Sequence, residues 1–528
     1  MNALDLLIVI LSLAIVVAVG LVAAQKRSDT AEGYFLASGK LPWFIIGSAF
    51  VSTSVSSEQI VGTTGAAYAN GMIIANWEWW TLPTYTLLIA LFIPLYLRNR
   101  VTTVADFLDR RYGPRCRDIY SWVMLVAYVV VFLVPVLYSG SLAIAQLMRW
   151  NLFIVLWAMV VLVALYTVKG GLVAVMWTDA VQCAMLVGGG LILYFYALRQ
   201  VPGGWSAMQA ANPQRFHLYK PPGDPDAPFL GLIAASMGVF LFYQAGNQVM
   251  VQRVLGARSI WDGMMGIVFA GFINLIRPLV TCFLGFIVYH WIHVMGRANP
   301  LKNIDLAFPF ALENLAPRWG LRGIVLAGFM AAVMSTLSAL SNSTATLFSL
   351  EVYRKLLRPG ASDARTVRVG QIASLLALVI AAILAPLVPK LGGVFNYFQT
   401  GVTYLATPFI SVMLLGILWR RTNYPAALFG IVGGLLIQIA AALALPKIWP
   451  GVNFLYIAFI AQVIIMAGIA IVALLTAPPP PERTEPFHWT PRLLSQLKVN
   501  ASRPWYANVW LWAGTYAAIW IGIYAWFW

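Results

Sequence analysis

The chain has 528 residues, of which 61% are hydrophobic and only 10% are charged. Soluble domains are about a quarter charged, so this composition excludes an ordinary soluble protein and predicts an all-α polytopic membrane protein. The formal net charge of +16 fits basic loops along one face of a lipid bilayer, and no nucleic-acid partner is needed to explain it.

Apolar runs along the sequence predict about fourteen transmembrane helices. The first, residues 4–24, could be mistaken for a signal peptide, but no basic side chain precedes it, and Lys26 and Arg27 follow it. This order of charges favours an uncleaved helix with an external N-terminus. The expected centres of the spans lie near residues 14, 55, 85, 130, 158, 186, 240, 275, 335, 378, 404, 434, 465 and 517.

The remaining charges agree with this orientation. Most of the 34 lysines and arginines fall in loops that an external N-terminus places on the cytoplasmic side. We therefore expect a multi-pass protein of the cell (inner) membrane with both termini external. The sequence contains no nucleotide-binding motif of the G-x-x-x-x-G-K-[ST] type, which favours an ion gradient over ATP as the energy source. Its 3 cysteines and 4 histidines show no disulfide or metal-ligand spacing.

The second span, residues 41–68, is interrupted by a polar segment. Hydrocarbon offers no water to backbone N–H and C=O groups, so such a break persists only where it lines a cavity or holds an ion. Interrupted helices are typical of secondary transporters. For Glu58, which lies in this polar segment, the alternative to a functional role is a structural charge that a neighbouring span satisfies. The segment reads Ser52-Thr53-Ser54-Val55-Ser56-Ser57-Glu58-Gln59.

Two further carboxylates lie at bilayer depth, where each charge costs about 2.5–3.5 kcal/mol or more. The third span carries Glu78 between Trp77 and Trp79, which favours a pocket wall. The sixth span carries Asp179, which could be a helix cap, an ion-pair partner or a functional group.

The seventh span is interrupted again, at residues 243–248, and so lies five spans after the first break. That spacing is typical of two five-helix repeats of inverted topology, each opening with a broken helix. Broken helices expose carbonyl oxygens that suit a hard cation. Hydroxyls at Ser335 and Thr336 in the ninth span could supply two more ligands, although helix packing explains them equally well.

Four sequence blocks, in this order, resemble the sodium:solute symporter family, the relatives of the bacterial sodium–galactose and mammalian sodium–glucose cotransporters. The resemblance covers about residues 40–417. The blocks are SEQIVG at 57–62 with YANG at 68–71, YTVKGGL at 166–172 with WTD at 177–179, NQ at 247–248 with QR at 252–253, and LSNSTAT at 340–346.

The resemblance implies a leucine-transporter-type core of two inverted five-helix repeats, with one extra helix before it and three after it. Residues 1–39 then form the extra helix and a cytoplasmic loop, and residues 40–200 form the first repeat. Residues 201–227 form an external loop, residues 228–418 the second repeat, and residues 419–528 the last three helices with a proline-rich linker.

The resemblance also implies a sodium site between the broken second span and the ninth span. Asp179 matches the family's aspartate linked to ion release. The sodium ligands are expected to be the carbonyls of Ser52, Val55 and Ala332 and the hydroxyls of Ser335 and Thr336.

For the solute, the resemblance implies hydrogen bonds from Gln59, Glu78 and Gln399. Trp77, Phe395 and Tyr243 are expected to close over the apolar face of a sugar ring, and Tyr243 matches the inner-gate tyrosine. The sequence departs from the galactose symporter where that protein has asparagines and a lysine. The asparagine positions hold Ser54, Phe132 and Phe240, and the lysine position holds Asn274.

Arg277 lies one helical turn beyond Asn274 on nearly the same face, where the family is usually apolar. One interpretation is an ion pair with a buried carboxylate, Glu58 or Glu78. The other is that Arg277 reaches the pocket and favours a solute with a carboxylate or several hydroxyls. Both Asn274 and Arg277 are therefore candidate solute-binding residues.

We expect a sodium-coupled symporter that imports a small polar solute, a sugar or polyol, by alternating access. One alternative is a sodium symporter for a carboxylate-bearing solute, namely a monocarboxylate, sialic acid or an amino acid. Another is a solute sensor that does not transport. An enzyme would need a convergent nucleophile, base or metal cluster, and because the sequence shows none we expect no enzymatic activity.

Overall fold

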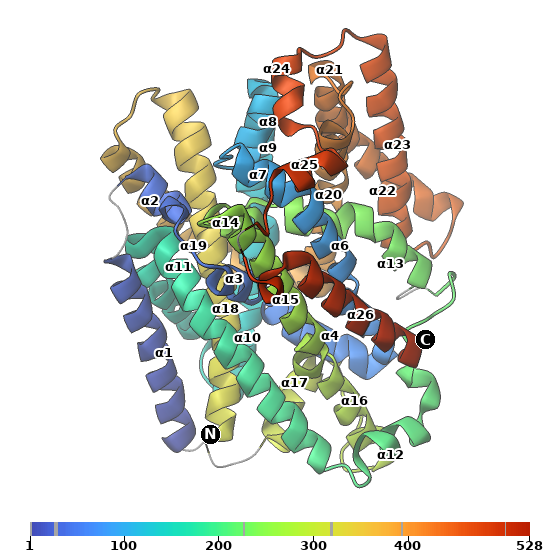
Figure 1. Cartoon of the computed structure of the whole chain (residues 1–528). Coiled ribbons are helices and arrows are strands. Elements are labelled where there is room, and N and C mark those ends of the chain that lie inside the picture. Colours follow the sequence, from blue (N-terminus) through green and yellow to red (C-terminus); the bar gives the residue numbers. More distant parts are fainter. Residues whose placement is uncertain (1–2, 26–29, 225–227, 317–319, 392–393, 502) are drawn as a thin grey trace.

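The computed structural model describes residues 3–25, 30–224, 228–316, 320–391, 394–501 and 503–528, and within these it describes no side chain at positions 58, 389–391, 394–397, 399 and 400. The side chains of Glu58, Phe395 and Gln399 therefore lie outside the described residues. The described residues form helices joined by short loops (Figure 1), and no β-strand occurs among them. The expected all-α fold is confirmed.

Eleven segments of the described chain are long and apolar enough to cross a membrane. Their number agrees with a polytopic protein, while the total of about fourteen spans stays a prediction. The segments are α1 (Ala3–Ala24); Met72–Arg98, with α5 (Asn76–Trp79), α6 (Thr81–Leu87) and α7 (Ile93–Arg98); Pro114–Met148, with α9 (Pro114–Ala127) and α10 (Val134–Met148); α11 (Leu152–Arg199); Phe229–Gly246, with α13 (Phe229–Ala235); Ile260–Val294, with α15 (Ile260–Thr281) and α16 (Phe283–Tyr289); Leu321–Leu357, with α18 (Leu321–Thr346); Asp363–Val388, with α19 (Asp363–Leu384); Gly401–Leu418, in α20 (Val394–Leu418); Tyr424–Ile448, with α21 (Tyr424–Leu428) and α22 (Gly434–Ile448); and α23 (Phe454–Leu475).

The other α-helices are shorter or less apolar. They are α2 (Ala31–Leu36), α3 (Trp43–Ser54), α4 (Ser57–Asn70), α8 (Val104–Arg111), α12 (Gly204–Ala211), α14 (Gln248–Leu255), α17 (Ala307–Phe310), α24 (Pro481–Thr484), α25 (Pro491–Gln496) and α26 (Val509–Phe527).

The second span is broken as predicted, because α3 stops at Ser54 and α4 starts at Ser57. The two residues between them, Val55 and Ser56, are extended. Short hydroxyl side chains compete with the helical backbone for hydrogen bonds, and Ser54 Oγ donates to the carbonyl of Val51 at 2.8 Å.

The seventh span is also broken as predicted. A π-helical turn ends at Gly246, Asn247 is extended with φ −92° and ψ 118°, and α14 begins at Gln248. The side chain of Asn247 accepts a hydrogen bond from Val249 N at 3.2 Å, so it caps the new helix.

Helix α11 consists of two helices that meet at Gly171. Gly171 has φ 59° and ψ −155°, and a Cβ there would lie 2.5 Å from the carbonyl oxygen of Tyr34. A Cβ on Gly20 of α1 would touch both Tyr166 and Thr178, which a straight helix would hold about 18 Å apart. The chain therefore turns back at Gly171, as the fifth and sixth predicted spans require.

Helix α18 lies at the centre of the packing. Its most apolar stretch is 94% buried. Helix α18 packs against α1, α3, α10, α11 and α19. Helix α1 lies at the edge of the molecule (Figure 1), with only 22% of its most apolar stretch buried. The expected division into two repeats with extra helices before and after them stays a prediction.

In Figure 1 the C-terminus lies at the right edge of the molecule, higher in the view than the N-terminus. The N-terminus and α12 occupy the same end in Figure 1. The loop after α12 meets the last residues of the chain, because Leu218 N donates to the carbonyl of Phe527 at 2.7 Å. Which side faces the cytoplasm stays a prediction from the charge pattern.

Gly171→Ala is expected to destabilise the protein by about 1–3 kcal/mol, because it forces a side chain into a disfavoured backbone conformation beside Tyr34. The matched control is Gly188→Ala in the same helix α11, where a Cβ meets nothing within 4 Å and alanine favours the helix. Thermal unfolding in detergent measures both. Equal melting temperatures for the two variants would contradict the turn at Gly171.

Candidate functional site

The break in the second span contacts α18. Thr336 Oγ1 donates to the carbonyl of Thr53 at 3.3 Å and, within its own helix, to that of Ala332 at 3.2 Å. At the preceding position, Ser335 Oγ donates to Asp179 Oδ1 at 2.7 Å. The structure therefore brings the two hydroxyls predicted as cation ligands to the end of α3.

Several oxygen atoms at this break lack regular helical partners. Because α3 ends at Ser54, no N–H group of the same helix donates to the carbonyls that follow Val51. Ser52 Oγ is buried and finds no hydrogen-bond partner among the described residues. Carbonyls freed by an unwound helix are the usual sodium ligands in transporters, so the donor set fits the ion. Coordination by Ser52, Val55, Ala332, Ser335 and Thr336 stays a prediction.

Asp179 is fully buried and forms an ion pair with Arg253 of α14, with 3.4 Å between Oδ2 and NH2. Thr53 Oγ1 donates to the same carboxylate oxygen at 3.4 Å. Of the explanations left open by the sequence, the structure supports the ion pair and not the helix cap. Through Ser335, this buried pair is connected to the predicted ion ligands.

A second buried ion pair joins Glu78 of α5 to Arg277 of α15. Gln59 Nε2 and Thr281 Oγ1 donate to Glu78 Oε1, at 2.9 Å and 3.3 Å. Arg277 NH1 donates to Ser54 Oγ, the last residue of α3, at 3.0 Å. The ion-pair interpretation of Arg277 is therefore confirmed, with Glu78 as its partner.

A cavity of about 70 Å³ adjoins this pair. Gln59, Trp77, Tyr243 and Arg277, all predicted solute contacts, line it. Ligand cavities commonly measure about 300–1,000 Å³, so this cavity has to widen before a sugar can enter. The described lining also includes Ser54, Thr81, Phe240, Gln244 and Phe398.

Asn274 bonds to the two neighbouring helices α5 and α6 and is not among the described residues that line this cavity. Its amide Nδ2 donates to the carbonyl of Glu78 at 2.9 Å and to Thr81 Oγ1 at 2.5 Å. These contacts hold α5 and α6 against α15. A direct contact between Asn274 and the solute stays a prediction.

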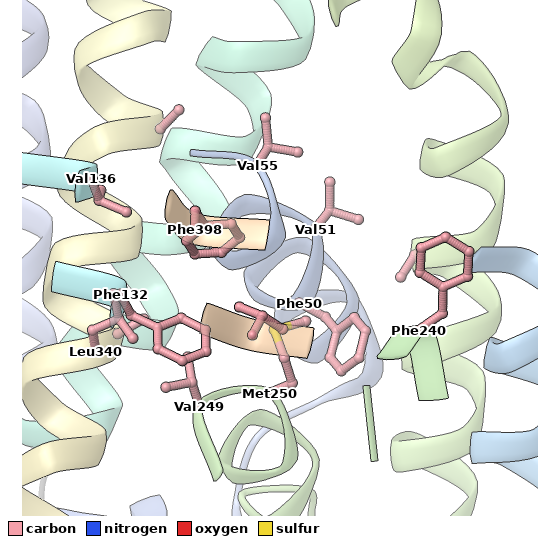
Figure 2. Packing of buried hydrophobic residues seen from close by; sticks show 14 of the residues in the cluster. Phe50, Val51, Val55, Phe132, Val136, Phe240, Val249, Met250, Leu340 and Phe398 are labelled. Carbon is pink, nitrogen blue, oxygen red and sulfur yellow. The ribbon is translucent and has the colours of Figure 1, made fainter. Parts of the chain in front are cut away.

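Aromatic side chains stand at two positions where the galactose-type pattern has asparagine. Phe132 packs edge-to-face on Phe398, with ring centroids 5.5 Å apart, and both belong to the apolar cluster shown in Figure 2. Phe240 packs in the same way on Trp77, also at 5.5 Å. Aromatic rings therefore form an apolar wall on the side of the cavity where the galactose-type pattern has polar side chains.

Three neighbours of the pocket are not among the residues predicted from the sequence. Thr281 follows Arg277 by one helical turn, so its spacing could have revealed it. Thr81 follows the tryptophan-rich segment directly. Phe454 of α23 stacks on Trp77, with centroids 6.1 Å apart and an interplanar angle of 13°. No local pattern could have found Phe454, because nothing in the sequence relates α23 to the third span.

A larger hollow, of about 1330 Å³, is bordered by α2, α8 and the segment Leu347–Leu357. Some of its charged groups are paired with one another, namely Lys355 with Glu351 at 2.8 Å and Arg110 with Asp106 at 2.8 Å. The smaller cavity, and not this hollow, adjoins the broken helix and the buried Glu78–Arg277 pair, and its role as the solute site stays a prediction.

The chain is similar in sequence to known transporters. The model of the sodium:solute symporter family matches residues 34–434. A sodium/glucose cotransporter from Vibrio parahaemolyticus is 30% identical over 459 residues, covering 82% of this chain and 84% of that protein. A sodium/myo-inositol cotransporter 2 from Sus scrofa is 29% identical over 535 residues, covering 92% and 79%.

The fold is similar to that of solved symporters. A substrate-bound, outward-open Na⁺-coupled sialic acid symporter superposes with a TM-score of 0.81 at 21% identity, covering 90% of this chain and 99% of that one. A nucleobase-cation-symport-1 family transporter in a closed conformation gives a TM-score of 0.51 at 12% identity, covering 86% and 97%. At these identities the likeness concerns the fold, and it confirms the expected leucine-transporter-type core.

Glu78→Gln is expected to cost about 3–5 kcal/mol of stability, because it leaves Arg277 charged and buried. Arg277→Leu is expected to cost a similar amount, because it leaves Glu78 buried without its ion-pair partner. The double variant removes both charges and is expected to recover most of the loss. Thermal unfolding of the wild type, both single variants and the double variant measures the coupling, and simple additivity would show that the two side chains do not interact.

Proposed function

The chain belongs to the sodium:solute symporter family, and from that premise we propose that it imports a neutral sugar or polyol together with sodium. One sodium ion entering down about 100 mV releases about 2.3 kcal/mol, and a tenfold concentration gradient adds about 1.4 kcal/mol. Together they support accumulation of a neutral solute by roughly a few hundredfold.

One observation carries the choice of a neutral solute. The guanidinium of Arg277, which lines the cavity, is already paired with Glu78. A carboxylate solute has to separate this buried pair, which is costly, whereas hydroxyl groups can hydrogen-bond to both members without adding charge. The sodium/glucose and sodium/myo-inositol cotransporters among the relatives support the same choice.

A carboxylate-bearing solute (sialic acid, a monocarboxylate or an amino acid) is the second candidate. Arg277 Nε has no hydrogen-bond partner in the described part of the chain, so the guanidinium keeps a donor for an anionic group. Such a solute would compete with Glu78 for the same arginine.

We also propose that sodium binds between the end of α3 and α18. Ser54 ends α3 and bonds to Arg277, so an ion that holds this end in place also orders one wall of the solute cavity. Asp179, hydrogen-bonded to Ser335, would assist release of the ion. The ligands would be the carbonyls of Ser52, Val55 and Ala332 and the hydroxyls of Ser335 and Thr336.

The protein is a multi-pass membrane transporter, and we assign it no enzymatic activity because the family and its relatives are transporters. Residues 40–200 and 228–418 would form the two inverted repeats and rock against each other during transport. The distribution of basic residues supports the cell (inner) membrane with both termini external.

Uptake by purified protein in liposomes tests the proposed function. With an inward sodium gradient, radiolabelled D-glucose or myo-inositol is expected to accumulate, and potassium or choline media are expected to abolish accumulation. Uptake of radiolabelled N-acetylneuraminate in preference to both would favour the carboxylate candidate. Equal uptake in sodium and choline media, with no proton gradient present, would reject sodium coupling.

Thr336→Ala and Ser335→Ala are each expected to raise the half-saturating sodium concentration at least about fivefold, because each removes one oxygen ligand worth about 1–3 kcal/mol. Ser341→Ala is the matched control: Ser341 is buried in the same helix α18, and its hydroxyl donates to the carbonyl of Ser338 at 3.2 Å. Initial uptake rates over a sodium titration measure the effect. A control that shifts as much as Thr336→Ala would contradict the assigned ligands.

A further inference from the structure

Helix α26 is joined to the third span by hydrogen bonds as well as by apolar packing. Many of its side chains are exposed, including Ile519, Ile521 and Trp526, while Tyr516 and Tyr524 are buried. The inner face makes three hydrogen bonds to the third span. They join Tyr516 OH to Thr86 Oγ1 (2.7 Å), Trp520 Nε1 to the carbonyl of Trp79 (2.9 Å), and Tyr524 OH to Asn76 Oδ1.

Two of these bonds end on α5, the single turn Asn76–Trp79 that carries Trp77 and Glu78. Asn76 is fully buried. Its Nδ2 donates to the carbonyls of Ile73 at 3.0 Å and Leu218 at 2.8 Å, and its Oδ1 accepts from Tyr524. One side chain therefore ties this turn both to the loop after α12 and to α26.

Helix α15 holds the same turn from another direction. Trp79 Nε1 donates to the carbonyl of Leu275 at 3.0 Å, and Asn274 Nδ2 donates to the carbonyl of Glu78 at 2.9 Å. The turn continues through Trp80, whose backbone is also helical, into α6. Its contacts with α15 and α26 therefore act together with this continuation to set the direction of Trp77 and Glu78.

The loop after α12 extends this arrangement to α4, which carries Gln59. Arg215 donates to the carbonyls of Ala67 and Tyr68, at 3.1 Å and 2.6 Å, at the end of α4. A Cβ on Gly71, which has φ 84°, would lie 2.7 Å from the carbonyl oxygen of Arg215. Leu218 of the same loop bonds to both Asn76 and Phe527.

We propose that α26 positions the solute site: Tyr524 and Trp520 hold the turn Asn76–Trp79 so that Trp77 faces the cavity and Glu78 meets Arg277. This inference rests on the proposed function in so far as it takes that cavity as the solute site. Tyr524 and Trp520 act through the turn and do not themselves line the cavity as described.

Tyr516 provides a matched control on the same helix. Its hydroxyl makes a hydrogen bond of the same kind, to Thr86, about two helical turns beyond the Asn76–Trp79 turn. Tyr516→Phe and Tyr524→Phe each remove one hydroxyl from α26 and preserve the ring. A difference between them therefore reports on position and not on the general stability of the helix.

The test measures sodium-driven uptake of radiolabelled D-glucose and myo-inositol by wild type, Tyr524→Phe, Trp520→Phe and Tyr516→Phe. Tyr524→Phe and Trp520→Phe are expected to raise the KM about three- to fifteen-fold, the range of one interhelical hydrogen bond in a membrane. The half-saturating sodium concentration and the maximal rate per folded protein are expected to stay unchanged. Tyr516→Phe is expected to keep the wild-type KM.

A wild-type KM in Tyr524→Phe, or an equal rise in Tyr516→Phe, would overturn the proposal. If wild type takes up neither probe, the proposed function fails, and amide hydrogen exchange of residues 72–81 then decides the present inference alone. Exchange there is expected to be faster in Tyr524→Phe than in Tyr516→Phe, and equal exchange in the two variants would overturn it.

Discussion

The end of α3 inside the second span is the constraint on which the rest of the site depends. Backbone oxygens freed there cannot be satisfied by hydrocarbon, so other spans have to approach them. Thr336 of α18 contacts the carbonyl of Thr53, and the buried Asp179–Arg253 pair lies beside the same residue. This need for polar partners explains why α18 is so hydroxyl-rich and yet lies at the centre of the packing.

The same break connects the two predicted sites. Thr53 contacts α18 and Asp179 on the ion side, while the next residue, Ser54, contacts Arg277 on the solute side. Neighbouring residues of one helix end therefore reach both sites. An ion that orders this turn changes the wall of the solute cavity without any long chain of intermediates, which is a physical basis for coupled binding.

Charge balance distinguishes this pocket from a simple sugar site. Arg277 supplies a cation in the membrane interior, and Glu78 neutralises it with help from Gln59 and Thr281. The surrounding wall is aromatic, through Phe240 and Trp77. A compact pair of opposite charges beside aromatic rings offers several hydrogen bonds and no net charge, as a polyhydroxylated ring needs.

Several features of this protein follow from the sequence alone, because the length of an apolar segment and its backbone hydrogen bonding depend on residues that are close in sequence. Those properties determined the all-α membrane fold, the two helix breaks and the presence of Glu78, Asp179 and Arg277 at bilayer depth. Only the tertiary structure decided that Glu78 is the partner of Arg277, that Arg253 is the partner of Asp179, and that Asn274 braces α5. The contact of Tyr524 with Asn76 spans 448 positions. Such partners depend on which helix faces meet, and no short-range pattern in the sequence records that.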